Sequence, residues 1–431
     1  MRLLNTLFIL ILPLVSAAQI SVSLKSAIDT TLKNSFDIQI AANIVGISKI
    51  NNTAGVAGAL PTVSASITDN QSVTKVLQRL NSGVEIQKNN ASGNNLTSNM
   101  TAGILLFNGF RVVATKARLE HLQKQSELQL NLIIQNSIAT VMAKYWDIVR
   151  QETYLRIIST LLDVSRNKLE IVTSRKNVGM ANDADYLQAL IDVNTVEQNL
   201  RSQKLVVEQT KTELLQLMSI KKYYSYDVGD SIIVDRSLQL NTILGFLQKN
   251  PQYLSFDQQV KISEQVVKEV SALRYPSLRL NTGLNFNRNE SAAGLTLMNQ
   301  NFGPYAGVTV QIPIYNGNAY KVQKETALFN VDNAKLQQQN LLNALTADAI
   351  KTYQTYSTTL QQINSQEHSV ELSGKLIKVV MARFKANQAT ILDVKAAQAS
   401  YENTGYQLVN LNYAAKIAEI ELKRLLYQLG D

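Results

Sequence analysis

The sequence predicts a mainly α-helical fold with a small β part, built as one unit that occurs twice. Long stretches lack turn residues, and the 431 residues include only 6 prolines and 18 glycines, so few positions interrupt a helix. Shorter stretches, in which apolar and polar residues alternate, separate the helical regions and predict strands. The same motifs recur in the same order in both halves of the chain.

The composition excludes several classes of protein. The chain has no cysteine and only two histidines, which excludes disulfides, thiolate catalysis and Cys-ligated zinc. The formal net charge is +9, but lysine and arginine are spread thinly, so nucleic acid is not a predicted partner. No Ser–His–acid signature or phosphate-cradling glycine loop is present. We expect no enzyme activity, no cofactor and no metal site.

Residues 1–18 have the pattern of a secretory signal. Arg2 is followed by an apolar core at residues 3–15 and then by three small residues, Ser16, Ala17 and Ala18, before a cut at Gln19. This core is too short to span about 30 Å of hydrocarbon. No cysteine follows the cut, so no N-terminal lipid anchor is expected. The sequence predicts an exported protein that would enter a membrane only as strands.

A fixed offset relates the two halves. Leu106-Phe107-Asn108-Gly109 recurs as Ile314-Tyr315-Asn316-Gly317, and the same offset of 208 positions takes Asp185 to Asp393. We predict a signal peptide at 1–18, a first structural repeat at 19–220, a linker segment at 221–237 that breaks the helix period, and a second repeat at 238–431. The chain therefore predicts a duplicated, pseudo-symmetric fold.

Each repeat is expected to contain a helix, a strand, a loop, a strand and two further helices. The first helices are expected at 24–57 and 238–273, and alternation begins after Pro61 and Pro276. The remaining ranges, first and second repeat in turn, are loops at 69–98 and 287–303, strands at 99–107 and 304–315, long helices at 109–177 and 317–386, and return helices at 183–220 and 391–429.

The long helices dominate the predicted fold. About 69 residues at a rise of 1.5 Å per residue give a helix of roughly 100 Å. The return helices carry an apolar seam at 3–4–3 spacing, formed by Leu408, Leu411, Ala415, Ala418, Leu422 and Leu425 and, in the first repeat, by Leu200, Gln203, Val207, Thr210, Leu214 and Leu217. This periodicity suits a coiled-coil rod and a tube equally well.

The four predicted strands have one apolar and one polar face, which suits a membrane barrel with lipid outside and water inside. Aromatic residues at the ends of the runs suit an interfacial girdle, namely Tyr275, Phe286, Phe302, Tyr305 and Tyr315. Four strands cannot close a barrel, so several chains would have to share one. The alternative is a pair of soluble hairpins with one face on a core.

An ordered set of motifs, present in both repeats, points to a family. Asn250-Pro251 opens the second repeat, Leu60-Pro61 and Tyr275-Pro276 precede the strands, and Asn-Gly follows them. The most specific motif is the helix–turn–helix block at 383–394 with Gln398, whose counterpart is 175–188. In this order the chain resembles the TolC-like outer-membrane efflux family, the outer membrane factors, over essentially the whole mature sequence.

The resemblance implies a homotrimer in which long helical hairpins form an α-barrel tunnel. It also implies a shared twelve-stranded outer-membrane β-barrel, with four strands from each chain. The protein would be a passive export duct of a tripartite efflux or type I secretion system. It would reside in the outer membrane of a Gram-negative-type cell, with the helical part in the periplasm. Its partners would be outer-membrane lipid, a periplasmic adaptor (membrane fusion protein) and an inner-membrane pump, and residues 221–237 would belong to an equatorial collar.

By position, Asp185 and Asp393 match the aperture aspartates of the family, so the hairpin tips near 178–185 and 386–393 would form the periplasmic entrance. Six carboxylates in a trimer would attract cations. The alternative is helix capping, because each aspartate lies three positions after a cap residue. The family's further acid is replaced by Ala396, and the glycine expected at the second turn is Asn387.

Arg175 and Arg383 are candidate latch residues at this aperture, with solvated surface arginines as the alternative. For the whole protein, the competing function is a periplasmic coiled-coil adaptor or scaffold that does not enter the membrane. A secreted enzyme is a third hypothesis, although the sequence lacks the catalytic signatures named above. The pair of alternating strand hairpins distinguishes the duct from the adaptor, because an adaptor does not need them twice.

Overall fold

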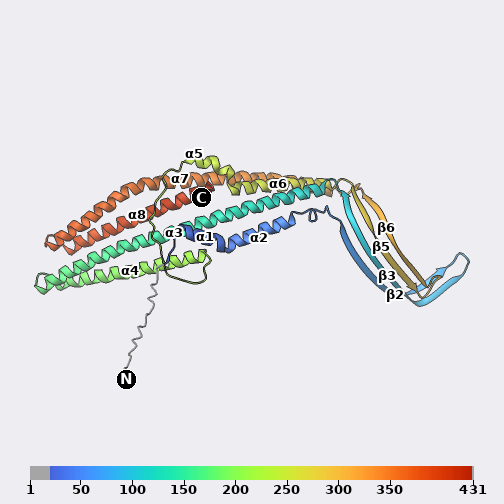
Figure 1. Cartoon of the computed structure of the whole chain (residues 1–431), viewed down its shortest axis with the longest axis horizontal. Coiled ribbons are helices and arrows are strands. Elements are labelled where there is room, and N and C mark those ends of the chain that lie inside the picture. The colour runs from blue at the N-terminus through green and yellow to red at the C-terminus, as the bar shows by residue number, and fades with distance from the viewer. Residues whose placement is uncertain (1–19, 430–431) are drawn as a thin grey trace, which may run out of the picture. The chain divides into compact units, whose positions relative to one another are not determined.

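The computed structural model describes residues 20–429, and the predicted signal segment lies outside the described residues. The elements, labelled in Figure 1, are β1 (Ile20–Ser21), α1 (Leu24–Asn34), α2 (Phe36–Asn51), β2 (Thr62–Arg79), β3 (Glu85–Phe107), α3 (Arg111–Asn177), α4 (Asp183–Leu217), β4 (Tyr226–Asp227), α5 (Leu240–Phe246), the 3₁₀ helix η1 (Leu247–Lys249), α6 (Pro251–Ala272), β5 (Ser277–Ser291), β6 (Met298–Gln311), α7 (Ala319–Lys385) and α8 (Ile391–Leu425). The mainly α fold with four strands in its main sheet is as predicted, but the strands are longer than predicted.

The chain divides into two compact units that do not coincide with the two sequence repeats. The hairpin unit comprises the residues up to 39, 132–250 and 344–431, and the sheet unit comprises 40–131 and 251–343. Each unit therefore contains segments of both repeats. Within residues 20–429, no helix has both the length and the apolar composition needed to cross a membrane.

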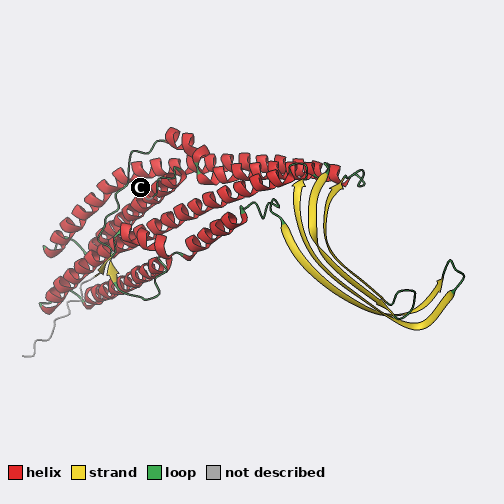
Figure 2. Cartoon of the chain, turned by 45° about the vertical axis from the view of Figure 1, so that its right-hand side comes forward, coloured by secondary structure: helices red, strands yellow, loops and turns green. Residues whose placement is uncertain are grey.

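The sheet unit contains one antiparallel sheet in the order β2-β3-β5-β6, whose strands run side by side in Figure 2. The register pairs Ala65 with Met100 and Met100 with Leu284, and directly paired side chains lie on the same face. This apolar face carries Val63, Ala65, Ile67, Met100, Leu280, Leu284, Val308 and Val310. Its large side chains are exposed in the single chain.

The predicted loops at 69–98 and 287–303 are wrong, because strands occupy most of both ranges. Pairing of β2 with β3 continues to Arg79 and Glu85, with one irregularity between Thr74 and Val76. A short turn closes this hairpin, with the Leu80 N–H donating to the Val84 carbonyl at 2.9 Å. Residues 69–98 are mostly polar, and their apolar residues, such as Val73, Val76 and Leu77, do not alternate regularly with polar ones. The range therefore lacks the pattern that reveals a strand, whereas backbone pairing does not require it.

The first helix of each repeat is interrupted where one continuous helix was predicted. Residues 24–57 form α1 and α2, which are separated at Ser35 and end at Asn51. Residues 238–273 form α5, η1 and α6, and the break falls at Asn250. Pro251 begins α6, where a missing N–H costs nothing because the first helical N–H groups have no intrahelical partner. The long helices α3 and α7 each have 67 residues.

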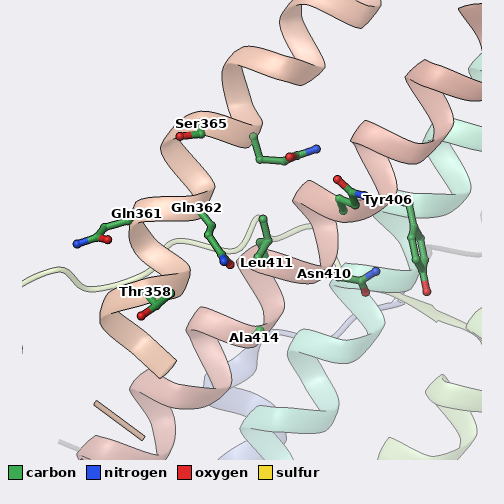
Figure 3. A pocket seen from close by; sticks show the side chains of 10 residues that line it. Thr358, Gln361, Gln362, Ser365, Tyr406, Asn410, Leu411 and Ala414 are labelled. Atoms are coloured by element: carbon green, nitrogen blue, oxygen red, sulfur yellow. The ribbon is translucent and has the colours of Figure 1, made fainter. Parts of the chain in front are cut away.

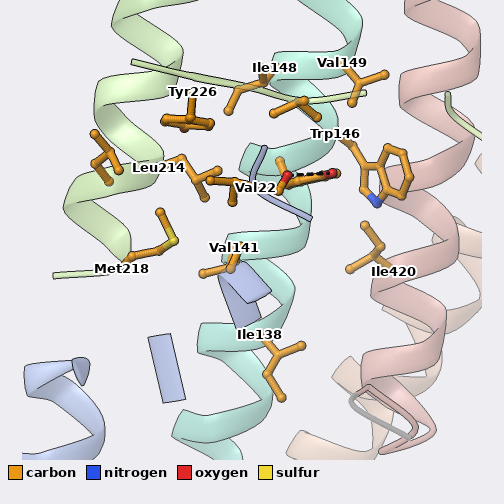
Figure 4. Close-up of a cluster of buried hydrophobic side chains, with 14 of the residues drawn as sticks. Val22, Ile138, Val141, Trp146, Ile148, Val149, Leu214, Met218, Tyr226 and Ile420 are labelled. Carbon is orange, nitrogen blue, oxygen red and sulfur yellow. Dashed lines mark hydrogen bonds between the residues drawn. The ribbon is translucent and has the colours of Figure 1, made fainter. Parts of the chain in front are cut away.

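The core of the hairpin unit forms around the middle of α3 (Figure 4). Tyr145, Leu214 and Tyr226 are fully buried there, and the buried side chains of Trp146 and Ile420 belong to the same cluster. Most of the predicted seam of the return helices is confirmed by burial. Its buried members are Gln203, Val207, Thr210 and Leu214 on α4 and Ala415, Ala418, Leu422 and Leu425 on α8.

The segment 221–237 is bound to both return helices. On α4, Lys211 forms ion pairs with Glu152 at 2.9 Å and Asp227 at 3.5 Å. On α8, the buried Glu419 accepts a hydrogen bond from the Asp235 N–H at 2.9 Å. Positions 211 and 419 correspond under the offset of 208. The two equivalent positions therefore both bind the segment 221–237, but one carries a positive side chain, Lys211, and the other a negative one, Glu419.

Replacing Gly109 with alanine should destabilise the protein more than replacing Gly317. Both glycines have left-handed backbone, with φ of +68° and +64°, so alanine costs about 1 kcal/mol at either position. A Cβ on Gly109 would also lie 2.8 Å from the Ala272 carbonyl oxygen, whereas Gly317 has open space. The measurement is Tm of the purified protein, and equal losses for the two variants would contradict the packing of α6 on this turn.

Candidate functional site at the tips of the two helical hairpins

The two hairpin tips have the same backbone geometry. Gly179 and Asn387 occupy equivalent positions, with φ of +77° and +63°. In each turn an N–H closes back on an arginine carbonyl at 2.8 Å, from Met180 to Arg175 and from Gln388 to Arg383. This is the pattern of a Schellman C-cap. Asn387 takes the place of the expected glycine because asparagine tolerates left-handed backbone better than most side chains.

Asp393 is held in a capping box at the start of α8. Its Oδ2 accepts from the Thr390 N–H at 2.7 Å, and its own N–H donates to the Thr390 hydroxyl at 3.2 Å. These hydrogen bonds from Thr390, backbone first and hydroxyl second, lower the pKa of the Asp393 carboxyl. The cap is therefore fully formed above the ordinary carboxyl pKa of about 4 and is lost as pH falls through the lowered pKa. The capping interpretation is confirmed for Asp393.

Asp185 differs from Asp393 at the equivalent position. Its N–H donates to Asn182 Oδ1 at 2.7 Å, so Asn182 caps α4. The carboxylate of Asp185 forms no hydrogen bond or ion pair with any residue in the range 20–429. The neighbouring Asp183 pairs instead with Lys176 at 2.8 Å, which lowers the pKa of the Asp183 carboxyl. At the tips, Asp185 therefore keeps a carboxylate that is not engaged in its own turn.

The two arginines also differ. Arg175 Nη2 donates to the Phe384 carbonyl, and its guanidinium lies 4.7 Å from the centre of the Phe384 ring. Phe384 is only 2% exposed and packs with Val172 and Ala189 of the first hairpin. Arg383 is exposed and donates to Gln388 within its own turn at 3.2 Å. Arg175 therefore joins the first hairpin to the second, whereas Arg383 does not.

Sequence reasoning missed a second connection between the hairpins, centred on Asp192. Asp192 pairs with the fully buried Lys168 on α3 and lies 3.5 Å from Lys395 on α8. Burial raises the pKa of the Asp192 carboxyl, but the hydrogen bonds from Lys168 and Gln188 and the charges of Lys168 and Lys395 together outweigh burial, so the pKa is lowered overall. The spacing offered a signal, because Lys168 and Asp192 are equally distant in sequence from Met180 at the turn.

An open groove of about 880 Å³ lies between α7 and α8 (Figure 3). Its lining is mostly amides and hydroxyls, including Gln361, Gln362, Ser365 and Asn410, with no carboxylate, amine or imidazole. Such a surface can form hydrogen bonds but offers no general base or charged ligand. Within the described residues, no cluster of three or more His, Cys, Asp or Glu side chains could hold a metal ion.

Comparison with known proteins identifies the family. The family described as "Outer membrane efflux protein" matches residues 27–219 and 245–426, one match in each repeat. The chain belongs to this family. It is an outer-membrane channel protein of efflux systems. The family match therefore does not favour the alternative of a periplasmic adaptor. The proteins it matches are channels rather than enzymes.

Several known outer-membrane proteins are similar to this chain over most of their length. The outer membrane protein TolC of Escherichia coli (strain K12) is 20% identical over 380 residues, which are 84% of this chain and 77% of TolC. The CmeC outer membrane channel of Campylobacter jejuni has a TM-score of 0.78 at 16% identity, covering 94% of this chain and 86% of CmeC. CusC has a TM-score of 0.77 at 16% identity, covering 95% of this chain and 92% of CusC. VceC of Vibrio cholerae has a TM-score of 0.74 at 18% identity, covering 94% of this chain and 95% of VceC.

Asp192→Asn should destabilise the hairpin tips strongly. The Lys168 side chain is 0% exposed, and loss of its counter-ion leaves a buried unpaired charge, which costs about 3–5 kcal/mol. The control is Glu197→Gln, which removes the exposed ion pair with Arg166 and should cost no more than about 1 kcal/mol. Amide hydrogen exchange of residues 160–200 measures both. Equal exchange in the two variants would contradict a buried, charged Lys168.

Proposed function

We propose that three copies of this chain form a passive export duct through the outer membrane. The supporting observation is the sheet of the sheet unit, which exposes an apolar face and has two edge strands, β2 and β6. Four strands from each of three chains would close a twelve-stranded barrel, cover both edges and turn the apolar face to lipid. The polar face, with Ser64, Asn281 and Thr309 among its residues, would line a water-filled passage.

Exposed apolar rows on two helices support self-association. On α7, three apolar residues at intervals of seven are exposed, namely Val322, Phe329 and Leu336, and α2 exposes Ile40 and Ile47 at the same interval. Such spacing suits helix–helix packing. In contrast, α3 has contacts on both sides within its own chain, with Asn52 after α2 and with Glu269 on α6. The proposed contact between copies therefore joins α2 of one chain to α7 of the next.

The hairpin tips would form the periplasmic entrance of the duct, with three Asp185 carboxylates as its cation-attracting ring. Asp393 would contribute mainly through its cap, and Arg175 would be the latch that holds the two hairpins together. Arg383 is the weaker latch candidate because it bonds within its own turn. This assignment rests on the different engagement of equivalent side chains at the two tips.

Energy and selectivity would come from partners. A periplasmic adaptor and an inner-membrane pump, in a tripartite efflux or type I secretion system, would engage the helical part in the periplasm of a Gram-negative-type cell. The amide-rich groove between α7 and α8 would suit an adaptor helix. The proposed chain organisation is a cleaved, non-lipidated signal at 1–18, repeats at 19–220 and 238–431, and an equatorial segment at 221–237.

Phe329→Asp should weaken the trimer, because it places a charge in an apolar contact between α7 and α2. Ile47→Asp should have the same effect from the other side of that contact. Asn330→Asp adds a charge at an exposed polar position of α7 that lies about 100° around the helix from Phe329, outside the apolar row, and should leave the trimer intact. Native mass spectrometry of detergent-extracted protein reports the assembly. Trimers that persist in both apolar-row variants would rule out the α2–α7 contact.

Asp185→Asn should weaken block of single-channel current by a trivalent cation in planar lipid bilayers, because three charges leave the entrance ring. Asp393→Asn should change this block much less, since that carboxylate bonds to Thr390. Replacing Asp185 and Asp393 together should add little to the first variant. An unchanged block in Asp185→Asn would leave capping as the only role of these positions.

A further inference from the structure

A pocket of about 580 Å³ lies at the strand-to-helix junction of the first repeat, within the sheet unit. The segment from the end of β3 to the start of α3 lines one side with Phe107, Phe110 and Val113, and the end of α6 and the turn after it line the other with Lys268 and Tyr275. The pocket thus combines three aromatic rings with one amine. Neither the proposed passage nor the hairpin tips use any of these side chains.

The strand register shows on which side of the sheet the pocket begins. Leu105 is opposite Arg279, on the polar face, but an irregularity between Leu105 and Phe107 inserts one extra residue. Phe107 is therefore opposite Leu278, which in turn pairs with Val310 of the apolar face. Without the bulge, Phe107 would share the face of Leu105. The bulge turns the aromatic ring to the face proposed to meet lipid, so the pocket is continuous with that face.

Phe110 has an unusual backbone for its residue type. Its φ is +67°, and the equivalent position in the second repeat is Asn318 with φ of +64°. Asparagine tolerates this conformation, whereas phenylalanine pays roughly 1–2 kcal/mol for it. Phe110 is nevertheless 71% exposed, and its ring packs nearly at right angles to the Phe107 ring, with 5.5 Å between the ring centres. The turn itself does not require phenylalanine, because asparagine makes the same turn in the second repeat. An exposed aromatic ring on a strained backbone therefore indicates contact with an apolar ligand.

The charge at the pocket indicates what kind of apolar ligand fits. Lys268 is exposed, and its side-chain amine forms no ion pair or hydrogen bond with the described part of the chain. An amine beside aromatic rings at a membrane boundary matches a phosphate headgroup above an acyl chain. A second copy of the chain is a poor occupant, because the helices on both sides of α3 belong to the same chain.

We propose that this pocket binds one phospholipid with an anionic headgroup per chain, in the periplasmic leaflet of the outer membrane. The acyl chain lies along Phe107, Phe110 and Val113, and the phosphate accepts a hydrogen bond from Lys268. This inference rests on the proposed placement of the sheet in the outer membrane. In the second repeat, Asn318 and Lys321 replace Phe110 and Val113, so the site occurs once in each chain.

Native mass spectrometry of detergent-purified protein supplied with phosphatidylglycerol tests the site. The wild-type protein should retain one lipid per chain. Phe110→Asn removes one buried apolar contact with the lipid, and Lys268→Gln removes one charged hydrogen bond to its phosphate. Each variant should therefore reduce lipid retention by about tenfold. Phe110→Asn places the residue of the second repeat on the same backbone, so the turn stays intact. Lys321→Gln is the control, since it removes an equal charge at the junction of the second repeat.

Unchanged retention in the Phe110→Asn, Lys268→Gln double variant would overturn the proposal, as would an equal loss in Lys321→Gln. Glycerophosphate carries the headgroup phosphate without acyl chains. If it bound as tightly as the lipid, the pocket would be an anion site and the lipid assignment would fail. Channel conductance of the same variants in planar bilayers is scored separately, so a failed lipid site leaves the proposed duct standing, and a non-conducting wild type counts against the duct alone.

Discussion

The structure depends on one constraint, which is that an antiparallel sheet with an exposed apolar face and two open edges is unfavourable in water. The apolar face costs about 25 cal/mol for each Å² left in contact with water, and the edges leave backbone groups ready to pair with another chain. Association of several chains within a lipid layer satisfies both requirements together. The exposed apolar rows on α2 and α7 present the same requirement for the helices.

Duplication supplied two copies of one backbone, and the copies then acquired different chemistry. The tip turns are nearly the same, yet Asp393 is engaged by Thr390 while the carboxylate of Asp185 is not engaged in its turn. Lys211 and Glu419 hold the two ends of one segment with opposite charges. The pseudo-symmetry therefore fixes where side chains lie, and the individual substitutions decide what each position does.

Local pattern was sufficient for the elements that repeat one period over many residues. The helices α3, α4, α7 and α8 were predicted to within about four residues at each end, because apolar spacing continues along them. The strand extension through 69–98 was missed because its few apolar residues do not alternate regularly with polar ones. The contact of Arg175 with Phe384 could not be predicted, since it depends on how two hairpins pack. Sequence likewise gave Asp185 and Asp393 equal roles, which their hydrogen bonds separate.

The central claim is that the apolar face of the sheet lies against lipid and the polar face lies against water. The chain has no cysteine, so single cysteines can be introduced and spin-labelled without a background. Accessibility to oxygen, which dissolves in lipid, and to a water-soluble nickel complex should alternate along β6 in reconstituted protein. Labels at Val308 and Val310 should favour oxygen, and a label at Thr309 should favour nickel. Uniform access to nickel at all three positions would contradict the account.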